Sequence, residues 1–363
     1  MEKVKKITMV SLIFVGSLCL MAGSGNGGNS GQSSVDKGSL YGDLYVILRD
    51  INGVPILDAN GCVQPISGTT GDLLSLDEEC ELLPGNESEV MEVDFGRLNV
   101  GRSPSVVMEA SFDEAISNIN SATSIDLDPA GRLLLTIDGL EETIDSPKQN
   151  LALYMKLMSL GHWITTDTSP LVRGNGQPGT NGSSEEDGPS SKSRPVLSYD
   201  ATCLLANLGF EHLGDSTNTT QDLNNNELLL AASLLAGAAD KTGTLTLDAI
   251  IYINSIYGIN QKGFLPGEVP DKTYFDFTNF TYFRSAVYEN RRDSQCSEGN
   301  VWTLVQQDDS GIYWKAECQN IMSAIFVNPP TDYTNVGGFV QAADDALRVI
   351  EFIHNYYVPE LSL

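Results

Sequence analysis

The N-terminal leader constrains this chain most, because it decides the compartment in which the chain folds. Residues 1–6 carry three lysines, an apolar run follows from Ile7 to Ala22, and the small residues Gly23 and Ser24 come next. This order is typical of a secretory signal peptide, and we expect cleavage after residue 24. The apolar run has sixteen residues, fewer than the about 20 of a membrane-spanning helix, so a membrane anchor is the less favoured alternative. We therefore predict an exported protein (periplasmic, extracellular or cell surface) with no integral membrane segment after cleavage.

Export allows disulfides to persist, and the cysteine spacing favours two pairs. Cys296 and Cys318 flank two strand-like segments that are joined by a polar, Gly-containing turn. This pattern predicts a β-hairpin at 300–316 whose open end is closed by a disulfide. Cys62 and Cys80 bracket a turn-rich loop in the same way.

Cys203 has no obvious partner. An unpaired cysteine in an exported protein suggests a functional thiol. The apolar sequence around Cys203 (Cys-Leu-Leu-Ala) instead favours a position on the buried face of a helix, where a free cysteine acts as a small apolar side chain.

The charge balance excludes several partners. The chain has 48 acidic and 21 Lys or Arg residues, a net charge of -27 and a pI near 4.2. Nucleic-acid binding needs clustered Lys and Arg, so we expect no nucleic acid partner. The three histidines are too few for a His-rich metal site. The remaining partners are proteins, or further copies of the chain at the cell surface.

Composition along the chain predicts an α+β protein, with a β-rich N-terminal part and a mainly helical C-terminal part that carries the stapled hairpin. The sequence leaves open whether the two halves are independent domains. The expected segments are a signal peptide (1–24), a flexible tether (25–38), a β-rich domain with one or two helices (39–171), a disordered linker or loop (172–197) and a mainly helical domain with aromatic-rich strands (198–363).

Capping residues and periodicity locate the individual elements. Ser146 and Pro147 form a strong helix start, and Gly161 is a matching stop. The other predicted helices cover 199–213, 227–239, 247–257 and 340–357. The predicted strands cover 44–48, 54–57, 90–95 and 132–137.

The string from Asp240 to Thr246 reads Asp-Lys-Thr-Gly-Thr-Leu-Thr. It resembles the phosphorylation motif of the P-type ion-pumping ATPases at all seven positions. The resemblance implies that Asp240 is a phosphate-accepting nucleophile assisted by Mg²⁺, as in haloacid-dehalogenase-like enzymes. The rest of the chain departs from those pumps, which have many membrane spans and a distal Gly-Asp-Gly-x-Asn-Asp string. The residues before Asp240 are Ala-rich and favour a helix, whereas the catalytic aspartate of that family ends a strand.

The same residues also fit a loop between two helices. With Gly243 at the sixth place of an EF-hand calcium loop, the first and twelfth places are Ala238 and Ala249, which supply no carboxylate. The ligand candidates at the third, fifth and ninth places are Asp240, Thr242 and Thr246. We therefore expect a helix-loop-helix that resembles an EF-hand pair in shape and binds Ca²⁺ weakly or not at all.

Two further features have a structural and a functional interpretation. His162, directly after Gly161, is the best isolated candidate for a catalytic base, but a packed side chain is the favoured interpretation. The aromatic residues of 274–288 could form a carbohydrate-stacking face, although a half-buried sheet explains their mixed spacing better.

No catalytic template fits the whole chain. We therefore expect an exported, acidic extracellular or cell-surface protein with a non-catalytic structural or interaction role. The alternative is an extracellular hydrolase, including a phosphatase with Asp240 as its nucleophile.

Overall fold

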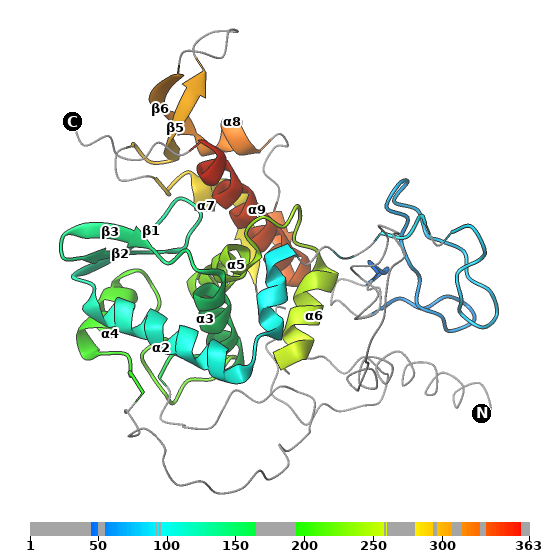
Figure 1. Cartoon of the computed structure of the whole chain (residues 1–363), viewed down its shortest axis with the longest axis horizontal. Coiled ribbons are helices and arrows are strands. Elements are labelled where there is room, and N and C mark those ends of the chain that lie inside the picture. The colour runs from blue at the N-terminus through cyan, green and yellow to red at the C-terminus, as the bar shows by residue number, and fades with distance from the viewer. Residues whose placement is uncertain are drawn as a thin grey trace, which may run out of the picture. The chain divides into compact units, whose positions relative to one another are not determined.

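The structure is a computed structural model of the chain (Figure 1). It describes residues 45–49, 55–86, 88–91, 93, 96–164, 194–257, 259, 280–292, 296–306, 314–326 and 332–356. The described residues form two compact units. Unit 1 holds those up to Val93, and unit 2 holds those from Gly96 onward. The signal peptide and tether predicted for 1–38 lie outside the described residues, as does most of the linker predicted for 172–197.

Unit 1 is built from short antiparallel contacts. The isolated β-bridges are Ile47–Pro65, Arg49–Pro55, Leu57–Val63, Ile66–Leu73, Ser67–Val90 and Leu76–Leu82. The backbone N–H of Ile56 donates to the carbonyl oxygen of Leu48 at 2.9 Å, which joins the strand-like segments predicted at 44–48 and 54–57. The turn expected between them lies outside the described residues. The disulfide Cys62–Cys80 closes this unit, as the spacing predicted.

Two turns of unit 1, nineteen residues apart, are built alike. The Asp58 carboxylate accepts hydrogen bonds from the backbone N–H groups two and four positions later, at 2.8 and 2.9 Å. Asp77 accepts the equivalent pair at 3.0 and 2.8 Å. The fourth residue of each turn, Gly61 or Cys80, has a positive φ of 86° or 68°. In each turn the carboxylate accepts hydrogen bonds that a backbone carbonyl would accept in an ordinary turn, which explains why both turns begin with an aspartate.

Within the described residues, unit 2 contains all the named helices and strands. In chain order they are η2 (Gly96–Arg102), α2 (Ser105–Ser121), β1 (Ser124–Leu127), β2 (Leu133–Ile137), β3 (Leu140–Thr143), α3 (Pro147–Leu160), α4 (Tyr199–Asn207), α5 (Asn225–Ala239), α6 (Leu247–Tyr257), β4 (Thr281–Phe283), α7 (Arg284–Tyr288), β5 (Asn300–Gln306), β6 (Trp314–Asn320), α8 (Ile321–Ile325), β7 (Asp332–Thr334) and α9 (Asn335–Tyr356). Strands β1, β2 and β3 form an antiparallel sheet in that order. The predicted α+β class is confirmed.

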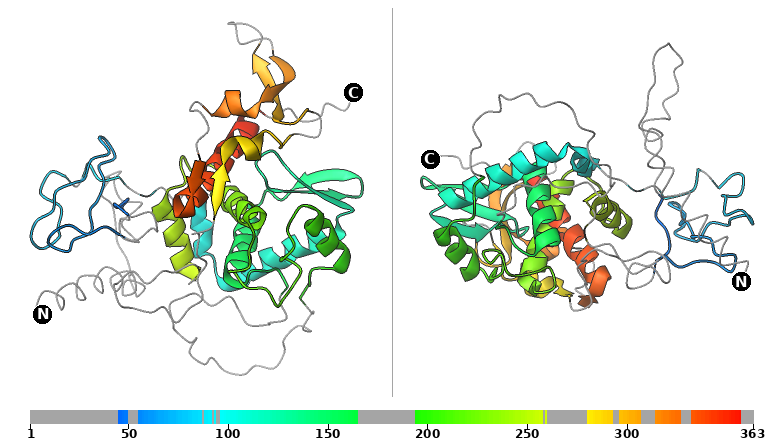
Figure 2. Two further views of the ribbon diagram at one scale, coloured as in Figure 1. Left: turned by 180° about the vertical axis from the view of Figure 1, so that it is seen from behind. Right: turned by 90° about the horizontal axis from the view of Figure 1, so that it is seen from below.

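Helix α5 forms the centre of unit 2. It packs against α3 and α9, and Figures 1 and 2 show it between these two helices. Its sequence is apolar on nearly all sides, and a helix of this kind is stable only when its neighbours cover it all round. At its start, Asn224 and Glu227 form a reciprocal capping box. Helices α3 and α5, which lie on either side of the 172–197 segment, pack against each other within unit 2.

Helix α3 begins and ends where its sequence predicted. The Ser146 side chain accepts a hydrogen bond from the backbone N–H of Gln149, and Pro147 occupies the first helical position. Gly161 ends the helix in the left-handed conformation, with a φ of 82°. A Cβ atom at Gly161 would lie 2.3 Å from the backbone carbonyl carbon of Thr219, so only glycine permits this close approach.

The hairpin predicted near the C-terminus is confirmed. Strands β5 and β6 pair antiparallel, with Trp302 opposite Cys318. The disulfide Cys296–Cys318 joins the residues at the open end. Within the predicted aromatic stretch, β4 pairs with β7, and Phe280, Tyr282 and Tyr288 are buried. These three aromatic side chains belong to the core, whereas Phe283 is 42% exposed, and residues 274–279 lie outside the described residues.

The interpretation of Cys203 as a buried side chain is wrong. Cys203 is on α4, but it is exposed. The buried face of α4 consists of Ala201 and Leu205, which are four positions apart, and Cys203 lies midway between them on the other side of the helix. The helix also ends at Asn207, earlier than predicted, because Gly209 adopts a positive φ of 84°.

No helix in the described part of the chain combines the length and the apolarity needed to cross a bilayer.

Candidate functional site

The segment that resembles a phosphorylation motif lies between two helices. Asp240 is the C-cap of α5, and α6 begins at Leu247. The predicted helix-loop-helix is therefore present, and Asp240 ends a helix instead of the strand that the phosphatase hypothesis requires. Asp240 is also only 4% exposed.

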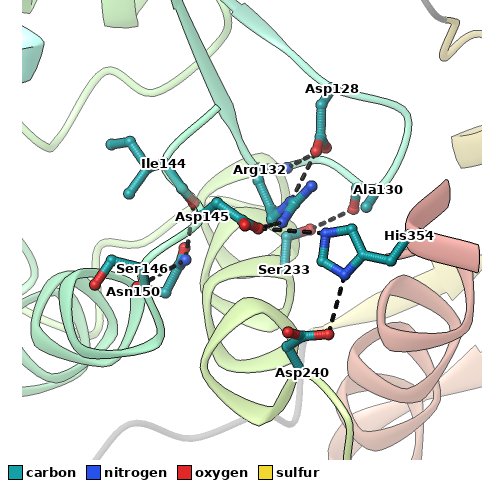
Figure 3. Close-up of polar contacts among 10 residues, drawn as sticks. All are labelled: Asp128, Ala130, Arg132, Ile144, Asp145, Ser146, Asn150, Ser233, Asp240 and His354. Atoms are coloured by element: carbon teal, nitrogen blue, oxygen red, sulfur yellow. Dashed lines mark hydrogen bonds and ion pairs between the residues drawn. The ribbon is translucent and has the colours of Figure 1, made fainter. Parts of the chain in front are cut away.

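Asp240 belongs to a chain of charged side chains, which we call the Asp240–Asp128 network (Figure 3). The His354 ring nitrogen Nδ1 lies 3.2 Å from Asp240 Oδ1, and its Nε2 lies 3.5 Å from Asp145 Oδ1. Arg132 donates from Nη1 to Asp145, and from Nε to Asp128 at 2.7 Å. Four carboxylate and cation contacts thus connect α9, the end of α5, the start of α3 and the β1–β2 turn.

Local structure fixes the positions of the carboxylates in this network. The backbone N–H of Arg132 donates to Asp128 Oδ1 at 2.8 Å, which closes the β1–β2 turn around both side chains. Ser233 of α5 donates to the carbonyl oxygen of Ala130 at 2.9 Å and ties this turn to α5. Asp145 directly precedes the α3 cap. The residue before Asp145, Ile144, is also tied to α3, because the Asn150 side chain donates to its carbonyl oxygen at 2.8 Å.

The contacts change the acidity of the network's side chains in a consistent direction. The hydrogen bond from His354 holds the pKa of Asp145 at about 2, against the opposing effect of burial, and Arg132 adds to the lowering. The same hydrogen bond raises the pKa of His354 above 6.5. Burial disfavours the charged form of Arg132, but Asp128 and Asp145 outweigh it and raise the pKa of the guanidinium. All these shifts favour the ionised forms.

The arrangement leaves His354 without the geometry of a catalytic base. In a catalytic dyad or triad, one ring nitrogen faces an orienting carboxylate and the other faces the nucleophile. In His354 both ring nitrogens face carboxylates, those of Asp145 and Asp240. An imidazole whose two ring nitrogens both face carboxylates links two acidic side chains, which is a structural role.

The predicted metal ligands Asp240, Thr242 and Thr246 have different surroundings. Thr246 accepts a hydrogen bond from the backbone N–H of Ala249 at 3.2 Å, at the start of α6. Thr242 is fully buried, and its hydroxyl has no hydrogen-bond partner in the part of the chain that the structure describes. Among the described residues, no group of three or more His, Cys, Asp or Glu side chains is arranged to hold a metal ion. Calcium binding by this loop stays a prediction.

A surface hollow lies beside the same loop. It has a volume of about 380 Å³, and its lining includes Gly243, Arg348 and Glu351. Asp240 does not contribute to this lining. The nucleophile candidate from the sequence, Asp240, is therefore not exposed to this hollow.

His162 is buried, as its favoured interpretation predicted. It is 8% exposed, and burial lowers its pKa below 6.5. Within the described ranges, its Nδ1 atom has no hydrogen-bond partner.

The sequence did not identify Arg132, Asp145 and His354 as a group. A weak signal exists for His354, because it lies in the last turn of an amphipathic helix, where a cation is favoured. The contact between His354 and Asp145 joins positions 209 residues apart, and neither spacing nor periodicity reports such a contact.

Comparison with known protein families, curated proteins and solved structures gave no significant match.

Proposed function

We propose that this chain is an exported, acidic extracellular or cell-surface protein with a non-catalytic structural or interaction role. The observation that carries the proposal is the engagement of both His354 ring nitrogens by carboxylates, one of them the buried Asp240. The candidate nucleophile is thus part of an ion-pair network that joins four elements. Two disulfides are compatible with an oxidising compartment.

An activity assay on Asp240→Asn tests the proposal. The purified chain and the variant are incubated with p-nitrophenyl phosphate and Mg²⁺, and the release of nitrophenol is followed. We expect no Mg²⁺-dependent rate in either protein. Asp248→Asn is the matched control, because Asp248 is a similarly buried aspartate (8% exposed) in the first turn of α6. A rate that Asp240→Asn abolishes and Asp248→Asn retains would establish the phosphatase alternative.

Weak calcium binding at Asp240, Thr242 and Thr246 is part of the proposal. The buried hydroxyl of Thr242, which has no partner among the described residues, is compatible with it. Thermal melting with Ca²⁺ and with chelator is the measurement. A ligand that binds only the folded chain raises the midpoint, and identical midpoints in Ca²⁺ and chelator would remove calcium from the proposal.

Export is tested on material purified from the native source. We expect the mature chain to begin near residue 25 and four cysteines to resist alkylation until they are reduced. A retained leader, or five freely reacting thiols, would contradict an exported protein.

A further inference from the structure

Unit 1 has an exposed apolar face that its own small core does not explain. Among its described residues, the buried apolar side chains are Cys62, Pro65, Leu74 and Val93. The large apolar side chains with 39–49% exposure are Ile56, Leu57, Leu73, Leu83 and Met91. Single exposed apolar residues are ordinary, but a concentration of them marks an interaction site.

The strand register brings four apolar side chains onto one face. Antiparallel partners share a face, and so do residues two apart in a strand. Ile66 is the partner of Leu73, and the neighbouring Ser67–Val90 bridge places Ile66 opposite Met91. The Leu76–Leu82 bridge places Leu83 opposite Ser75, two positions after Leu73.

We call Ile66, Leu73, Leu83 and Met91 the open face. It spans four neighbouring strand segments, which is a width of about 15 Å. The alternate residues Ser67 and Leu74 point to the opposite face and are buried. The open face is therefore the apolar side of the sheet that unit 1 does not cover itself.

Acidic side chains flank two members of the open face. Residues 45–93 contain ten acidic residues and a single basic one, Arg49. Glu81 and Glu89 are exposed, and they precede Leu83 and Met91 by two positions. A second copy of the chain would bring the same acids to the interface, and the net charge of -27 opposes that contact. Nucleic acid and anionic lipid are repelled for the same reason.

We propose that the open face of unit 1 docks a basic, apolar segment of a partner protein. This inference rests on the proposed interaction role and gives that role a partner chemistry. Leu and Ile side chains of the partner would cover the open face, and its Lys and Arg side chains would meet the flanking acids.

Synthetic peptides test the docking on the full-length protein. The probe is a labelled twelve-residue peptide of alternating Lys and Leu, and binding is measured by fluorescence anisotropy in 0.15 M NaCl. One comparison peptide replaces every Leu by Ser and keeps the charge, and another replaces every Lys by Glu and keeps the apolar content. We expect the Lys–Leu peptide to bind at least about tenfold more tightly than either. Equal binding of the two Lys peptides would reduce the effect to non-specific charge attraction and overturn the proposal.

Two pairs of variants assign the binding to the open face. Leu73→Ser with Leu83→Ser should weaken the Lys–Leu peptide by about tenfold or more. The matched control, Val106→Ser with Leu140→Ser, removes side chains of unit 2 that are 67% and 68% exposed, and it should leave affinity unchanged. An equal effect of both pairs would contradict the proposal.

Two pairs of charge-removing variants keep the test valid if the leucine variants misfold. Glu81→Gln with Glu89→Gln should weaken binding and flatten its salt dependence, whereas the exposed pair Glu141→Gln with Glu142→Gln in β3 should not. Equal effects would again overturn the proposal. Dimerisation of the chain that the leucine variants abolish would assign the open face to a second copy instead. None of these measurements depends on the phosphatase assay, so a catalytic Asp240 and a failed docking site are separate outcomes.

Discussion

Unit 1 and unit 2 are stabilised in different ways. Unit 2 buries large side chains such as Trp163, Tyr154 and Phe112 completely, and it pairs its buried charges. Unit 1 buries few apolar side chains and relies on aspartate-based turns and the disulfide Cys62–Cys80. The difference follows from size, since a short segment cannot cover both faces of its sheet and needs covalent support. As a result, the open face of unit 1 stays partly exposed, and it is the face that we propose for docking a partner.

The largest effect should come from breaking a buried ion pair of unit 2. Arg284 Nε and Nη2 donate to Asp345 at 2.6 and 2.8 Å, and both side chains are 6% exposed or less. Arg284→Met removes the cationic partner of the buried Asp345 carboxylate, to which Tyr282 and Gln341 still donate. We expect a loss of about 3–5 kcal/mol in the free energy of unfolding, measured by urea denaturation. Lys315→Met breaks the exposed pair with Glu317 and should cost less than about 1 kcal/mol. Equal losses would mean that burial does not decide the strength of these pairs.

Removal of the disulfide should act on unit 1 alone. The bridge closes a loop of 18 residues, so Cys62→Ala with Cys80→Ala should destabilise unit 1 by about 3 kcal/mol. Hydrogen exchange read out by peptide is the measurement, and we expect unit 1 amides to lose protection while α3 and α5 keep theirs. The control is Cys296→Ala with Cys318→Ala, which should leave unit 1 protected. Loss of protection in both units after removal of Cys62 and Cys80 would show that they unfold together.

Alanine substitutions at two glycines, one in each unit, test the difference in packing between the units. Gly161 in unit 2 and Gly71 in unit 1 have φ values of 82° and 76°, but only Gly161 has backbone atoms within 4 Å of a Cβ position. Alanine at either position should lower the free energy of unfolding by about 1 kcal/mol, because a residue with a Cβ atom is strained in the left-handed conformation. We expect Gly161→Ala to lose about 2 kcal/mol in total, because it also displaces Thr219. Thermal melting measures both losses, and equal losses would refute the difference in packing.

The smallest effect concerns pH. The raised pKa of His354 stabilises unit 2 below pH 6.5, and the contribution is lost as pH rises through the folded value. The lowered pKa of Asp145 stabilises it above pH 3.8, and that contribution is lost as pH falls toward 2. His354→Gln should therefore cost most between about pH 4 and 6.5, by less than about 1 kcal/mol because Asp145 is largely solvent-exposed. Stability curves of both proteins from pH 3 to 9 test this, and a constant difference would contradict it.

The sequence predicted the local features and missed the long-range ones. Ser146, Pro147 and Gly161 defined α3 because capping depends on neighbouring residues. Both disulfides followed from turns that their cysteines bracket. Cys203 was misplaced because its apolar neighbours do not reveal which side of a short helix packs.

The candidate site was predicted only in part. The helix-loop-helix around Asp240 followed from local propensity. Its contact with His354 joins residues 114 positions apart, and such a contact exists only once α5 and α9 pack together. The open face was hidden for a related reason, since its members become neighbours through strand register.

The bridge between Cys62 and Cys80 also determines how damage to unit 1 would appear. A protease that cuts the exposed stretch from Gly68 to Leu73 produces two fragments that remain covalently joined. The cut molecule would therefore keep its full mass on a non-reducing gel and separate only after reduction.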